Sequence, residues 1–136
     1  MGALRICLWV TGIACLTAVP GIFMPMSSWE PVIKFFGIES LPEAPIFEYG
    51  ARLMCATYAA TGIYFIILGL RPLKYGILVP FSGLACVLLG VFCWITGKET
   101  AMPPKWFLSD SLSALILGVL ILLFWLRAKK SSAKSV

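Results

Sequence analysis

The sequence predicts an all-α membrane protein, a four-transmembrane-helix bundle with a short interfacial helix between helices 1 and 2. Composition is the first indication, because 60% of the 136 residues are hydrophobic and only 12% are charged. A soluble domain usually has about a quarter charged residues and roughly half apolar ones, so this composition argues against a water-soluble globular domain. The second indication is that the apolar residues gather in four long runs.

Each run is long enough to cross a bilayer, which takes about 17–25 apolar residues in a helix. A helix is the natural form because lipid offers no partner for a free backbone N–H or C=O group. We expect the first run to be a true span rather than a cleaved signal peptide, because no A-x-A-like site follows it. The runs place four spans in a single transmembrane domain over residues 1–136, at residues 6–26, 47–70, 76–96 and 106–126.

The connection between the first two spans is expected to hold a short helix over residues 28–37. Ser28 is a suitable N-cap, Pro31 is tolerated in the first turn, and Gly37 can end the helix. The segment is apolar enough to lie in the membrane interface. We interpret it as a lid that packs over the bundle, and the alternative is a gate over a lipid-facing cavity.

The distribution of charge predicts the orientation. Four spans put both termini and the second connection on one side, with seven basic residues and no acidic one, whereas the other side has four basic and all six acidic residues. Cytoplasmic ends are enriched in Lys and Arg, so we expect an integral protein of the plasma (inner) membrane with its N-terminus and C-terminus cytoplasmic. The basic cytoplasmic tail, residues 127–136, is too short to fold and is expected to lie against anionic lipid head groups.

Three charged residues lie inside the predicted spans at similar depth, near the span ends opposite the termini. Glu48 and Arg52 form an i, i+4 pair with the acid first, which is the better order, and Asp110 lies in the last span. The first two share a helix face with small residues and are expected to face the bundle interior. Tyr49 and Tyr58 are candidate hydroxyl partners. Such charges are functional candidates by default, and the alternative is a structural ion pair or side chains that snorkel to the interface.

Glycines mark the faces on which the helices pack, because small residues let helix backbones approach closely in membranes. A seven-residue repeat keeps one seam facing a neighbour. Since the connection at residues 71–75 is short, we expect spans two and three to form a hairpin in which the glycine seams can meet. The candidate packing residues, spaced by seven, are Gly62, Gly69, Gly76, Gly83 and Gly90.

Residues for familiar catalytic or metal chemistry are scarce. The chain has no His, which excludes a His-based metal site, a Ser-His-Asp triad and a His proton shuttle. All five cysteines lie inside predicted spans, without a CxxC motif, and are interpreted as small packing residues. No Gly-rich phosphate loop, HExxH or GxSxG motif occurs. We therefore expect no catalytic residue, no metal and no cofactor.

The order of short motifs along the chain is distinctive. The first span ends at a proline, Pro25, and an amphipathic segment with Trp29 follows. The second span opens with Glu48 and Arg52 and closes with residues 69–72, Gly-Leu-Arg-Pro. Over nearly its whole length the chain thereby resembles the DoxX-like small membrane proteins, including the DUF4345-type members. The resemblance implies a four-helix bundle, and it implies that Arg52 and its acid, Glu48, are the candidate site residues. Some relatives are linked to quinone- or thiosulfate-related electron transfer, but no redox motif here carries that over.

Two functional interpretations stay open. The first is a non-enzymatic small integral membrane protein, either an accessory subunit or a binder of a lipid-like or hydrophobic small molecule in the outer-leaflet half of the bundle. The alternative is a small proton-coupled transporter that uses Glu48 or Asp110. Four-span multidrug exporters use an acid in the first span, and none lies between Arg5 and Glu30 here. The expected partners are membrane lipids, a second copy or a larger membrane complex, and no nucleic acid.

Overall fold

The computed structural model describes residues 2–39, 45–100 and 102–133, and all regular structure within them is helical. Four segments are long and apolar enough to cross a membrane: Gly2–Phe23, Pro45–Leu70, Leu78–Glu99 and Pro104–Ser131. The predicted all-α fold with four spans is confirmed, and the chain is an integral membrane protein. The elements are α1 (Gly2–Leu16), α2 (Pro20–Phe23), the 3-10 helix η1 (Met26–Trp29), α3 (Glu30–Phe35), α4 (Pro45–Leu70), α5 (Leu78–Glu99) and α6 (Pro104–Ala133).

The first span is broken rather than continuous. A turn over residues 17–19 separates α1 from α2, and the backbone N–H of Val19 donates to the carbonyl of Leu16 at 3.0 Å. Pro20 explains the break, because it has no N–H to donate and its ring clashes with the carbonyl four residues earlier in a straight helix. The span also begins at Gly2 rather than near residue 6.

The last helix is longer than predicted. The basic tail was expected to be too short to fold, yet α6 continues through it to Ala133. Alanine, lysine and arginine are strong helix formers, and they extend a helix that the last span has already nucleated. Residues 134–136 of the predicted tail lie outside the described residues.

The short helix predicted between the first two spans is present as η1 followed by α3. Pro31 lies in the first turn of α3, as expected, and Gly37 ends the segment with a φ of 87°, which favours glycine. The predicted cap is wrong, because Trp29 occupies the N-cap position of α3 and makes no side-chain capping bond. Ser28 lies instead inside the 3-10 turn, where its backbone N–H donates to the carbonyl of Pro25.

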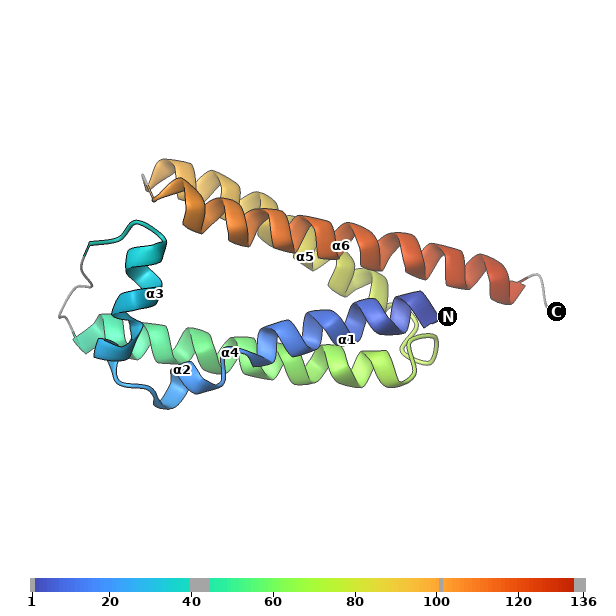
Figure 1. Ribbon diagram of the computed structural model, residues 1–136. Coiled ribbons are helices and arrows are strands. Elements are labelled where there is room, and N and C mark those ends of the chain that lie inside the picture. The colour runs from blue at the N-terminus through green and yellow to red at the C-terminus, as the bar shows by residue number, and fades with distance from the viewer. Residues whose placement is uncertain (1, 40–44, 101, 134–136) are drawn as a thin grey trace.

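The long helices pack as two pairs, α1 with α4 and α5 with α6, and the pairs meet mainly through α1 and α6 (Figure 1). The expected hairpin of spans two and three is therefore wrong. Although a short turn joins α4 to α5, each packs on a different partner, and they are linked by a hydrogen bond of 2.8 Å between the hydroxyls of Tyr64 and Ser82.

Both ends of the described chain lie at one end of the bundle, together with the turn after α4 (Figure 1). We call this the basic end, and the opposite end, where α3 stands, the α3 end. The main buried core lies toward the basic end and draws on all four long helices. Its residues are Leu4, Cys7, Leu8, Phe65, Leu68, Val79, Ile121 and Ala128. Among the described residues, the buried hydrophobic side chains toward the α3 end are Ile33 and Cys55.

Candidate functional site

Within each helix pair, glycines lie where the two helices contact each other. A Cβ on Gly62 would lie 2.7 Å from the carbonyl oxygen of Gly12, and one on Gly118 would lie 2.7 Å from that of Gly83. Distances this short exclude any side chain, so α1 with α4 and α5 with α6 approach backbone to backbone. Farther along the second pair, the Ser111 hydroxyl donates to the carbonyl of Gly90 at 2.7 Å.

Four of the five predicted packing glycines therefore lie in helix contacts. The seven-residue spacing did not predict which helix each of them contacts. The four are Gly62, Gly69, Gly83 and Gly90. Gly69 packs against the ring of Trp9, so it too serves the first pair. The prediction for Gly76 is wrong. It lies in the turn before α5 with a φ of 49°, and a Cβ there would meet nothing within 4 Å. Its role is conformational, because L side chains rarely adopt a positive φ.

Residues 26–37, which we call the strap, link the two helix pairs at the α3 end. On one side, Trp29 packs on α2, since a Cβ on Gly21 would lie 2.5 Å from its ring, and α2 in turn packs on α4. On the other side, the ring of Phe36 meets that of Trp106 edge to face, with centroids 4.8 Å apart. Figure 1 shows α3 between the two pairs at this end.

Glu48 and Arg52 pair as the spacing predicts. Arg52 Nη2 donates to Glu48 Oε1 at 2.5 Å, and each side chain is 45% exposed. The expectation that both face the bundle interior is wrong for Arg52, which is exposed. The pair lies at the edge of the α4 face whose centre, at Cys55 and Gly62, is buried. The carboxylate also lies in the first turn of α4, where it interacts favourably with the helix dipole.

The other predicted site residues are distributed differently. Asp110 makes no ion pair with a basic residue in the described part of the chain, so it is not joined to the Glu48–Arg52 pair. It lies within electrostatic range of the Tyr58 hydroxyl on α4 and of the Cys93 thiol on α5. Neither side chain is buried, because Asp110 is exposed and Tyr58 is 41% exposed. Tyr49 is more exposed still, at 68%, and no hydrogen bond of the described structure involves its hydroxyl.

One polar group that the sequence did not single out is the indole N–H of Trp29. Its Nε1 atom is buried and makes no hydrogen bond within the described structure. A buried donor without an acceptor costs about 1–3 kcal/mol. Tryptophan near a span end is normally assigned to the membrane interface, so sequence carries no signal that this ring turns inward against Gly21.

The cysteines Cys7, Cys15, Cys55, Cys86 and Cys93 are all free thiols. Within the described ranges, no three His, Cys, Asp or Glu side chains gather closely enough to hold a metal ion. Comparison of the chain with protein-family models, with curated proteins and with solved structures finds no match.

Proposed function

We propose that the protein is a non-enzymatic membrane protein that binds a lipid-like or hydrophobic small molecule between its two helix pairs at the α3 end. The observation that carries this proposal is that the two helix pairs are held together differently at the two ends of the bundle. A buried core joins the pairs toward the basic end, whereas aromatic contacts of the strap link them at the α3 end.

The chemistry between the pairs supports a ligand with an apolar body and a polar head. Each pair packs its glycine face internally, so we expect larger apolar side chains to form the surfaces between the pairs. Small-molecule sites are mostly apolar with a few polar groups that fix orientation. The groups we propose for this role are the Tyr58 hydroxyl and the Asp110 carboxyl, which lie within electrostatic range of each other, and the buried Trp29 N–H.

The orientation and the family belong to the same proposal. The excess of Lys and Arg at the basic end favours cytoplasmic termini and the plasma membrane, which would put the α3 end in the outer leaflet. The motif order supports membership of the DoxX-like proteins. An accessory role in a larger membrane complex, or a second copy of this chain as partner, is compatible with such a ligand site.

Native mass spectrometry of the full-length protein in detergent tests the proposal and reports the oligomeric state as well. We expect the parent to retain a hydrophobic molecule, and the combined change Tyr58→Phe with Asp110→Asn to lower its occupancy at least fivefold, about 1 kcal/mol. Tyr49→Phe is the matched control, because it removes a hydroxyl from a tyrosine of the same helix that is 68% exposed. A stably folded parent without any retained molecule, or equal occupancy in all three proteins, would contradict it.

The second candidate function is a small proton-coupled transporter. The observation in its favour is that Asp110 makes no ion pair within the described residues, whereas Glu48 is engaged by Arg52. A carboxyl without a fixed cation is the better proton carrier, so Asp110→Asn should abolish gradient-driven uptake into proteoliposomes, and Glu48→Gln should reduce it less. Absence of any gradient-dependent flux of candidate cargoes rules this function out.

A further inference from the structure

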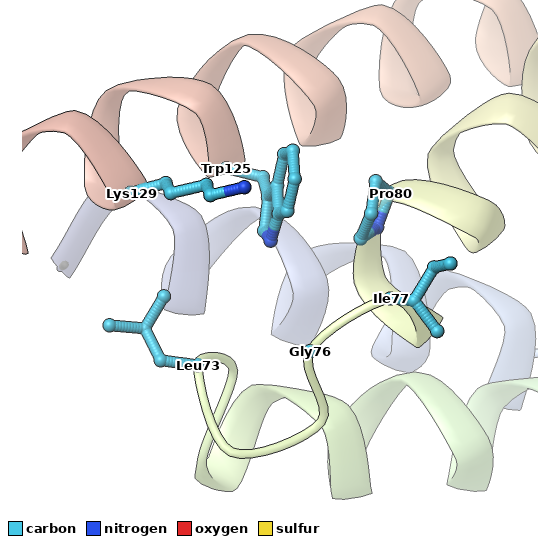
Figure 2. A pocket seen from close by; sticks show the side chains of 6 residues that line it. All are labelled: Leu73, Gly76, Ile77, Pro80, Trp125 and Lys129. Carbon is cyan, nitrogen blue, oxygen red and sulfur yellow. The ribbon is translucent and has the colours of Figure 1, made fainter.

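A second candidate site lies at the basic end, away from the strap. There the turn after α4, the start of α5 and the last turns of α6 surround an open groove with a volume of about 420 Å³. Figure 2 shows Trp125 and Lys129 of α6 facing the turn and the first residues of α5 across it. The groove is lined by Leu73, Gly76, Ile77, Pro80, Trp125 and Lys129.

The lining is apolar apart from one cation. Lys129 Nζ lies 5.2 Å from the centroid of the Trp125 ring, in cation–π geometry. The two residues meet because α6 continues past the predicted end of its span, which brings side chains four residues apart onto one face. Gly76 lies on the opposite wall of the groove and has no side chain that could fill it, and a Cβ there would meet nothing within 4 Å.

The surroundings of Lys129 are positively charged throughout. No carboxylate pairs with it in the described part of the chain. The acidic residues that the structure describes belong to the α3 end: Glu30, Glu39, Glu48, Glu99 and Asp110. The described basic residues of this end are Arg5, Arg71, Lys74, Arg127, Lys129 and Lys130. Of these, Arg5 is engaged with the chain itself, donating to the carbonyl of Leu70 at the end of α4.

We propose that this groove binds one anionic phospholipid, whose phosphate pairs with Lys129 and whose glycerol and upper acyl carbons lie on Leu73, Ile77 and Trp125. Basic pockets between transmembrane helices near the membrane surface suit lipid head groups. The apolar wall favours a lipid over free phosphate, because a small anion gains from several converging donors and the lining offers one. Tryptophan and lysine both prefer the depth at which the head group meets the acyl chains.

Titration of the full-length protein in detergent with a short-chain phosphatidylglycerol, followed by native mass spectrometry, tests the inference. We expect Lys129→Gln to weaken phosphatidylglycerol binding about fivefold, the effect of one basic residue near a membrane surface. Lys130→Gln is the matched control, an adjacent exposed lysine that does not line the groove, and it should bind like the parent. Phosphatidylcholine should bind the parent several-fold more weakly.

A second variant distinguishes a loss of lipid binding from a folding defect. Ile77 is 80% exposed, so Ile77→Trp should be tolerated in the fold while it fills the groove and lowers phosphatidylglycerol binding with all charges kept. Three results would overturn the inference: equal losses in Lys129→Gln and Lys130→Gln, equal binding of the two lipids, or displacement of phosphatidylglycerol by millimolar inorganic phosphate. The last would identify a site for the free anion.

Discussion

The two ends of the bundle hold the helix pairs together in different ways. At the basic end, large side chains from all four long helices form one buried core, to which the Tyr64–Ser82 hydrogen bond adds a polar link. At the α3 end, the pairs are linked by aromatic contacts of a single strap, Trp29 on one side and Phe36 on the other. The difference indicates that the basic end contributes most to joining the pairs, while the contacts at the α3 end are few and aromatic.

The largest expected effect comes from breaking the core of the basic end. Leu8 is fully buried there, and Leu8→Ala should lower the free energy of unfolding in detergent by about 2–4 kcal/mol, because it removes packing and leaves a cavity. Leu88→Ala, at a side chain that is 61% exposed, should change it by less than about 0.5 kcal/mol. Similar losses for both would mean that the pairs do not depend on this core.

Loosening the strap should have a smaller effect on stability and a larger one on local motion. Phe36→Leu removes the edge-to-face contact with Trp106, worth about 1 kcal/mol. Hydrogen exchange in detergent should become faster at residues 33–37, while the amides of the core helices at the basic end keep their protection. Phe23→Leu is the control, because Phe23 is 80% exposed. Faster exchange across the whole molecule would show that the strap carries the global fold.

The smallest expected effect concerns the ion pair on α4. Arg52→Ala should lower the free energy of unfolding by about 0.3–0.5 kcal/mol, as an exposed i, i+4 pair does, since each partner is 45% exposed. The more exposed Lys34–Glu30 pair of α3 is a matched reference, and Lys34→Ala should cost no more. A thermal unfolding curve for Arg52→Ala that shows a loss above about 2 kcal/mol would indicate that the pair lies in a low-dielectric setting.

The sequence allowed single residues of the candidate site to be predicted, but not how these residues lie relative to one another. The Glu48–Arg52 contact follows from residue spacing on one helix, so it could be predicted. The separation of Asp110 from that pair could not, because it depends on which face of α6 packs against α5. The buried position of the Trp29 ring could not be predicted for the same reason, since its contact with Gly21 requires the break at Pro20 and the return of the strap.

The sequence by itself determined the four spans, the short helix with its end at Gly37, and the charge difference between the two ends. Each of these depends on interactions within a few residues or on the length of an apolar run that lipid must solvate. Tertiary structure decided that α4 packs on α1 rather than on α5, and that the basic end alone acquires a core of large side chains. A glycine repeat marks a face on which a helix can pack, but several helices carry such faces, and the choice among them is made by the fit of whole helices.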